Sequence, residues 1–147
     1  MPRLDLTTTI NAPIGRCFDL ARSIDFHMVT TRDTGERAVA GRTSGLIALG
    51  DSVTWRARHL GVWQSLTVQI VAMERPTHFR DAMVRGAFAS MVHDHDFAED
   101  SPGVTTMRDR FVFEAPLGPF GWLANRLFLA AYMRRFLAER ARILKEA

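Results

Sequence analysis

The sequence predicts an α+β fold in which a curved antiparallel β-sheet wraps around one long C-terminal helix, with two short helices after the first strand. Two observations lead to this prediction. The chain ends in a stretch of strong helix formers, Pro119–Lys145, whose first half is apolar nearly all round. Between residues 51 and 113, apolar and polar residues alternate in short runs separated by turn residues, as in consecutive antiparallel strands. A helix that is apolar on several sides needs a concave sheet face to cover it.

The long helix is predicted to begin at Pro119, because the first helical turn tolerates a residue without an N–H group. Apolar residues then recur at helical spacing; they are Leu123, Leu127, Leu129, Met133, Phe136, Leu137 and Leu144. Arginine and glutamate dominate the second half. We therefore expect the helix to be deeply packed at its start and to emerge into water at its end, with surface pairs such as Arg135 with Glu139.

The composition indicates one folded domain over residues 1–147, of which 47% are hydrophobic. The net charge is only +3 and the arginines are dispersed, which does not favour nucleic-acid binding. The single cysteine, Cys17, has no partner for a disulfide or a zinc site, and we expect it to be buried. Neither a membrane span nor a signal peptide is recognisable, so a cytoplasmic protein is expected.

The first half of the chain is predicted to hold two strands and two short helices. Residues Arg3–Ile10 alternate and are rich in threonine and leucine, as in a strand. A helix with Pro13 near its first turn runs through Ala21, and Ser23–Met28 forms the second helix. Residues 30–50 are irregular and rich in glycine, with a short strand near Ala38–Ala40. They lack the Gly-Lys-Ser/Thr ending of a phosphate-binding loop.

Five further strands follow, each with one apolar face. They are predicted at residues 53–59, 64–73, 79–83, 91–97 and 105–113, with turns at residues 60–62, 75–77, 85–86 and 101–103. In the strand 64–73, Ala72 is expected to share the apolar face with Leu66, Val68 and Ile70.

This order of elements resembles the START-like superfamily, also called SRPBCC, which includes polyketide cyclases, plant pathogenesis-related proteins and lipid-transfer domains. The resemblance covers nearly the whole chain. It is carried by Ile10–Pro13 leading into Phe18–Arg22, and by Pro116–Gly121 before the last helix. It implies a helix-grip fold with an internal cavity for a small hydrophobic or amphipathic molecule, lipid- or polyketide-like. It implies no cofactor and no metal.

Strict alternation places five polar residues on the apolar face of the sheet, and unpaired polar groups there would cost a few kcal/mol each. The five are His59, Asp81, His93, His95 and Asp109, and their apolar companions are Trp55, Met83, Met91, Met107 and Phe111. Together with Trp122 and Met133 of the last helix, these are the candidate ligand-binding residues.

Three interpretations of the polar residues stay open. They can pair with one another and hold the wall of the sheet together, or they can anchor the polar end of a bound molecule. In the third interpretation, His93, His95 and Asp109 act as general acid and base in a cyclase- or dehydratase-like reaction. A metal site could also be formed by His93 and His95 with Asp81 or Asp109. A His-x-His pair alone is a weak signal for metal binding, so we predict no metal.

Overall fold

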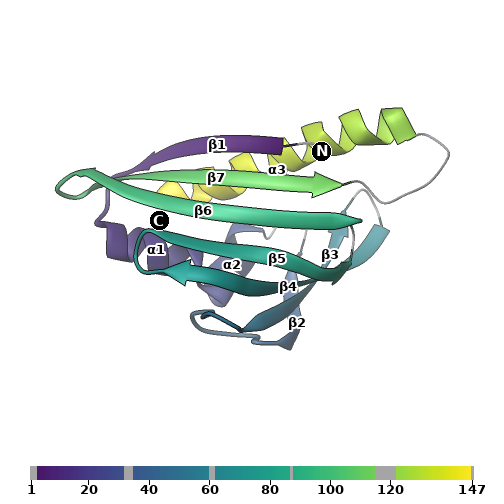
Figure 1. Ribbon diagram of the computed structural model, residues 1–147, viewed down its shortest axis with the longest axis horizontal. Helices are drawn as coiled ribbons and strands as arrows, with labels where there is room; N and C mark the ends of the chain where they lie inside the picture. Colours follow the sequence, from purple (N-terminus) through teal and green to yellow (C-terminus); the bar gives the residue numbers. More distant parts are fainter. Residues whose placement is uncertain (1–2, 32–34, 60–61, 87, 115–121, 147) are drawn as a thin grey trace.

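In the computed structural model, the described residues form a seven-stranded antiparallel sheet and three helices (Figure 1). The structure describes residues 3–31, 35–59, 62–86, 88–114 and 122–146, and at residues 59, 62 and 122–130 the backbone only. The elements are β1 (Arg3–Ile10), α1 (Ile14–Ala21), α2 (Ile24–Thr30), β2 (Arg37–Gly41), β3 (Ser52–His59), β4 (Val62–Glu74), β5 (His78–Gly86), β6 (Ser90–Ser101), β7 (Val104–Glu114) and α3 (Trp122–Glu146). None of the helices in this part of the chain is long and apolar enough to cross a membrane.

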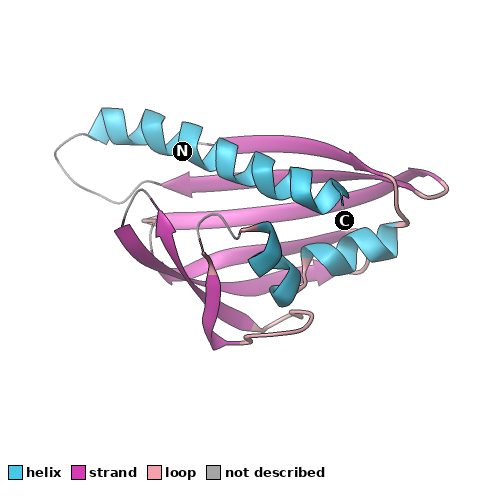
Figure 2. Cartoon of the chain, turned by 180° about the vertical axis from the view of Figure 1, so that it is seen from behind, coloured by secondary structure: helices cyan, strands magenta, loops and turns pink. Residues whose placement is uncertain are grey.

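The strands lie in the order β1-β7-β6-β5-β4-β3-β2, and each pairs antiparallel with its neighbours. The chain therefore meanders from β2 to β7, and the first strand closes the edge beside the last. All three helices lie on one side of the curved sheet, with α3 running alongside β1 (Figure 2). This arrangement confirms the predicted fold class.

The predicted alternation is clearest in β7. Met107, Asp109 and Phe111 are buried, whereas Arg108 and Arg110 between them are exposed. The side chains that point inward meet α1 at the other side of the core, where Phe18 is almost completely buried. Its ring lies edge-on to Phe79 and Phe97, with centroids 5.4 and 5.5 Å away. The period of two along each strand thus fixes which residues can reach the interior.

The expected inward position of Ala72 is wrong. The register of β4 against β5 shifts between Ile70, which pairs with Asp81, and Ala72, which pairs with the exposed Arg80. One extra residue in a strand reverses the faces of all residues beyond it, which is the effect of a β-bulge. Met73 consequently takes the inward position and packs against the core.

The expected element bounds need small corrections. Pro13 is the N-cap of α1, which agrees with its expected place near the first turn. The α2 helix extends beyond Met28 to Thr30, and the Ser23 side chain caps its start by accepting from the Phe26 N–H at 3.1 Å. The expected turn at residues 85–86 is wrong, since β5 continues to Gly86. The turn at residues 60–62 and the start of the last helix at residues 119–121 fall largely outside the described residues.

The expectation that α3 emerges into water at its end is also wrong for one face of the helix. Leu137, Ala141 and Leu144 are buried there, on a helix that packs against β1 and α2. Arg140 is buried with them, at 9% exposure, and its Nη2 donates a hydrogen bond to the Ala21 carbonyl at 3.2 Å. Glu139 on the outer face pairs with Arg142 at 2.7 Å.

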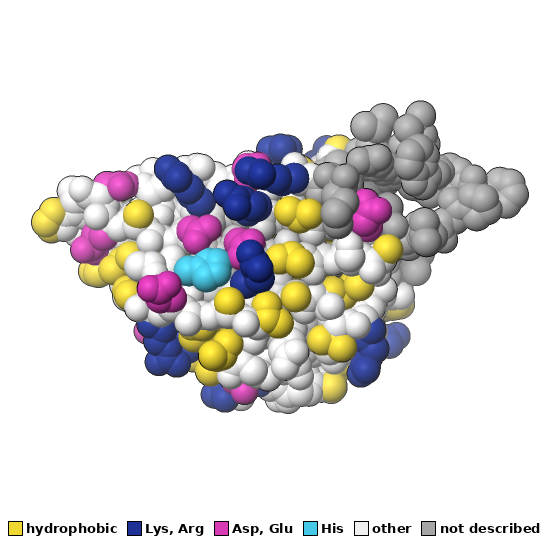
Figure 3. Space-filling view, in the orientation of Figure 1, with side chains coloured by type: hydrophobic (Ala, Val, Ile, Leu, Met, Phe, Trp, Pro, Cys, Tyr) yellow, Lys and Arg dark blue, Asp and Glu magenta, His cyan; other side chains and the backbone are white. Residues whose placement is uncertain are grey.

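The opposite face of the sheet carries basic and acidic side chains next to each other (Figure 3). Arg80 donates two hydrogen bonds to the carboxylate of Asp94, at 2.7 and 3.2 Å. His78 lies beside them, with its Nδ1 2.9 Å from Asp96. The charged outer face and the apolar inner face together leave the interior between sheet and helices as the place for a site.

Candidate functional site

A cavity of about 200 Å³ lies between the inner face of the sheet and α3. Its described lining is His27, Glu36, Trp55, Ala57, Gln64, Ser65, Leu66, Val68, Asp81, Phe88, Met91, His93, Phe111, Tyr132, Met133, Phe136, Leu137 and Arg140. A smaller cavity of about 70 Å³ adjoins it towards α1 and α2. The residues that line both are His27, Trp55, Val68, Asp81, His93 and Arg140. Ionisable side chains are therefore concentrated where the two cavities meet.

Two aspartates and two histidines form a hydrogen-bonded cluster at this junction. Adjacent strands place them: Asp81 is on β5, His93 and His95 are on β6, and Asp109 is on β7. The register sets Asp81 opposite His93 and Asp109 opposite His95. Side chains two residues further along a neighbouring strand are also within reach, so diagonal pairs can form.

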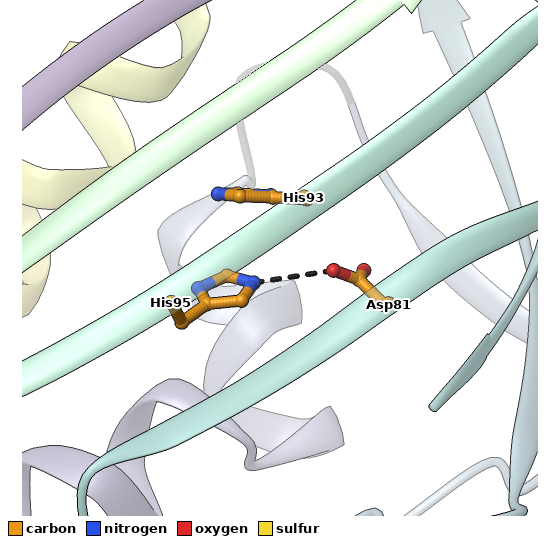
Figure 4. Close-up of side chains that lie close together, drawn as sticks. All are labelled: Asp81, His93 and His95. Atoms are coloured by element: carbon orange, nitrogen blue, oxygen red, sulfur yellow. Dashed lines mark hydrogen bonds and ion pairs between the residues drawn. The ribbon is translucent and has the colours of Figure 1, made fainter. Parts of the chain in front are cut away.

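The shortest contacts of the cluster are such diagonals. His93 Nε2 lies 2.9 Å from Asp109 Oδ1, and His95 Nε2 lies 3.2 Å from Asp81 Oδ1 (Figure 4). His95 Nδ1 lies 3.2 Å from the same oxygen of Asp109. Oδ1 of Asp109 therefore contacts a ring nitrogen of both histidines.

Aromatic stacking fixes the planes of these rings. The His93 and His95 rings stack with centroids 3.8 Å apart, and Phe79 stacks on the other face of His95 at 4.1 Å. Phe111 meets His93 edge-on at 5.3 Å. Aromatic rings thus contact both faces of the His95 ring, and carboxylates contact the ring nitrogens of both histidines.

The environment keeps both carboxylates ionised. Burial alone would raise the pKa of Asp109, but hydrogen bonds and charge from His93 and His95 hold this pKa well below its ordinary value. Burial would likewise raise the pKa of Asp81, yet the hydrogen bond and charge of His95 lower it, and the charge of Arg140 adds to this effect.

The two histidines are pushed in opposite directions. Burial and the neighbouring charge of His95 lower the pKa of His93, and the bond to Asp109 does not offset them. Burial would also lower the pKa of His95, but its contacts with two carboxylates outweigh burial and raise the pKa. Of the two rings, His95 between the two aspartates therefore holds a proton more readily, and His93 at the cavity wall loses one more readily.

A second histidine–carboxylate pair faces the cluster from the helical side. His27 of α2 has its Nε2 3.5 Å from the buried Glu36, and its ring lies 4.1 Å from that of Trp55. Arg140 reaches the same region from α3. The junction thus combines acidic, basic and neutral polar groups beside an apolar wall.

Comparison with known proteins gives a result at the level of structure only. No family model matches the sequence, and no curated protein matches it. Among solved structures, the protein TTHA0849 of Thermus thermophilus superposes with a TM-score of 0.81 at 18% identity, covering 99% of this chain and 95% of that one. A START superfamily protein of Mycobacterium smegmatis gives a TM-score of 0.74 at 12% identity, covering 98% and 97% of the two chains.

A major latex-like protein of Panax ginseng is similar over 94% of this chain and 97% of its own, with a TM-score of 0.57 and 17% identity. The chain has the START-like fold. In proteins of this START-like, helix-grip shape the sheet wraps around the C-terminal helix, as the order of elements predicted. Identities this low establish the fold and leave the chemistry of the site to its own residues.

Within the START-like framework, the candidate residues from the sequence fall into three groups. Those that line the larger cavity are Trp55, Asp81, Met91, His93, Phe111 and Met133, and His95 lines the smaller one. Met83, Met107 and Asp109 lie on the inner face but are not among the described lining residues. The side chains of His59 and Trp122 lie outside the described residues.

Sequence reasoning missed His27, Glu36 and Arg140. A signal for Arg140 exists, because it lies three residues after Leu137 and seven after Met133 and so shares their stripe of the helix. His27 and Glu36 have no comparable signal, since Glu36 belongs to an irregular segment and only the packing of α2 brings the two residues together.

Proposed function

We propose that the protein binds a small amphipathic molecule in the cavity between the sheet and α3. The observation that carries this proposal is the uneven lining of the cavity. Aromatic and aliphatic side chains form most of its wall, and the ionisable groups gather at the junction with the smaller cavity. Small-molecule sites typically have this composition, an apolar enclosure with a few polar groups that fix orientation.

In this proposal the apolar body of the molecule contacts Leu66, Phe88 and Phe136, and its polar end meets His93 and Arg140. The volume of about 200 Å³ is somewhat below the range of about 300–1,000 Å³ for typical small-molecule pockets. The proposal therefore favours a compact lipid- or polyketide-like molecule over a long-chain lipid that is wholly enclosed.

The test is a titration of the metal-free protein, kept in EDTA, with 1-anilinonaphthalene-8-sulfonate and with a series of short fatty acids. Saturable binding to the folded protein at one site per chain is expected. Ala57→Leu fills the cavity from β3, where Ala57 is 3% exposed, and should weaken binding at least tenfold. Ala82→Leu is the matched control, because Ala82 pairs with the exposed Gln69 on the outer face of the sheet.

The polar end is tested with His93→Gln. Removing one hydrogen bond to the bound molecule should weaken affinity by about 0.5–1.5 kcal/mol, roughly twofold to tenfold. Absence of saturable binding to wild-type protein, or equal effects of the two alanine variants, would refute the proposed site.

A further inference from the structure

We propose that Asp81, His93 and His95 form a binding site for a divalent metal ion of the zinc type at the junction of the two cavities. Each residue offers one ligand atom, and the three atoms lie within 4.8 Å of one another. Figure 4 shows the three side chains close together, with the His93 ring over the His95 ring and His95 hydrogen-bonded to Asp81 of the neighbouring strand. Two imidazole nitrogens and one carboxylate oxygen are a ligand set that suits zinc and related ions.

The hydrogen bonds of Asp109 select which nitrogens remain for the ion. Its Oδ1 accepts from Nε2–H of His93, which leaves the Nδ1 lone pair of that ring. The same oxygen lies 3.2 Å from Nδ1 of His95, which leaves Nε2 on the side of Asp81. Metal-binding histidines commonly donate their second ring N–H to a carboxylate in this way, which fixes tautomer and orientation.

The distances require only a small rearrangement. Ligands about 2.1 Å from a tetrahedral ion are roughly 3.4 Å apart, and His95 Nε2 is 3.2 Å from Asp81 Oδ1. All three ligand atoms lie within 4.8 Å of one another, so no separation exceeds the ideal by more than roughly 1.4 Å. Rotation of the Asp81 carboxylate about χ2 can supply this change, because that torsion has broad minima and Asp81 is the most exposed of the three side chains.

Charge and access also agree with the proposal. The two positive charges of the ion would balance Asp81 and Asp109. Asp81 and His93 line the larger cavity, so the three-ligand ion would keep an open position there. A carbonyl or carboxylate oxygen of the bound molecule could occupy that position, a step that rests on the proposed function.

The experiment is isothermal titration of EDTA-treated, desalted protein with Zn²⁺, without fatty acid or dye. One ion per chain is expected. Asp81→Asn and His95→Gln should each lower the Zn²⁺ affinity at least tenfold. Asp109→Asn should lower it about 10–100-fold, because the carboxylate that orients the two histidine rings is lost. The matched control is His78→Gln, which removes the histidine of the outer-face cluster with Asp94 and Asp96 and should leave Zn²⁺ affinity unchanged.

A measurement on the wild-type protein avoids any dependence on how the variants fold. The chain has five histidines, and Zn²⁺ should shift the ring ¹⁵N signals of His93 and His95 while leaving those of His78 in place. Unmoved signals of His93 and His95, or no binding to wild-type protein, would overturn the metal site. Fatty-acid binding in EDTA tests the cavity separately, so failure of one proposal is distinguishable from failure of the other.

Discussion

The buried cluster makes a sharp prediction for Asp109→Asn. Asp109 is 4% exposed, and its Oδ1 lies 2.9 Å from His93 Nε2 and 3.2 Å from His95 Nδ1. Asparagine keeps the shape of the side chain but removes its charge, so His95, whose pKa two buried carboxylates raise, loses one of them. Breaking a buried ion pair by removing one partner typically costs about 3–5 kcal/mol. We expect a loss of that size.

The matched control is Asp96→Asn. Asp96 also lies 2.9 Å from a histidine nitrogen, that of His78, but its side chain is 49% exposed. An exposed ion pair contributes about 0.2–1 kcal/mol, because water screens it. The two substitutions are identical in chemistry and in contact distance, so the difference between them isolates the effect of burial.

The assay is urea unfolding at pH 7 in the presence of EDTA, followed by circular dichroism. With an m-value of about 2 kcal/mol/M, Asp109→Asn should lower the midpoint by roughly 2 M and Asp96→Asn by less than about 0.5 M. Equal small shifts would show that the cluster is hydrated and would refute the electrostatic reasoning. A rise in stability for Asp109→Asn would mean that the two carboxylates repel each other more than they hold His95.

Three further predictions concern the core. Phe18→Ala should lower the free energy of unfolding by about 3–5 kcal/mol in the same assay, because Phe18 is 1% exposed and packs between Phe79 and Phe97. The control Val84→Ala, at a half-exposed position, should change it by no more than about 0.5 kcal/mol. Similar losses for the two variants would contradict the packing. Burial raises the pKa of the Cys17 thiol, so iodoacetamide at pH 8 should modify native protein far more slowly than urea-unfolded protein. Because the folded pKa is the higher one, stability should fall as pH rises through the pKa of the unfolded thiol; rapid native alkylation would contradict the burial.

Local pattern was sufficient to predict the inner face of the sheet. His93, His95 and Asp109 point inward because side chains alternate along a strand, and that rule needs no knowledge of the partner strands. The same reasoning failed at Ala72, where a bulge adds one residue to β4. A bulge arises from pairing between strands, so a single strand's pattern does not reveal it.

The composition of the site was decided by tertiary structure. The sequence placed Asp81 and His95 on one face, but only the register of β5 against β6 brings their polar atoms to 3.2 Å. Arg140 resembles a solvated helix residue in the sequence, but the packing of α3 brings it to the Ala21 carbonyl at the end of α1. His27 meets Trp55 only because α2 lies over the inner face of the sheet. Periodicity fixes the direction of a side chain relative to its own backbone, whereas the distance between two side chains depends on how separate elements pack.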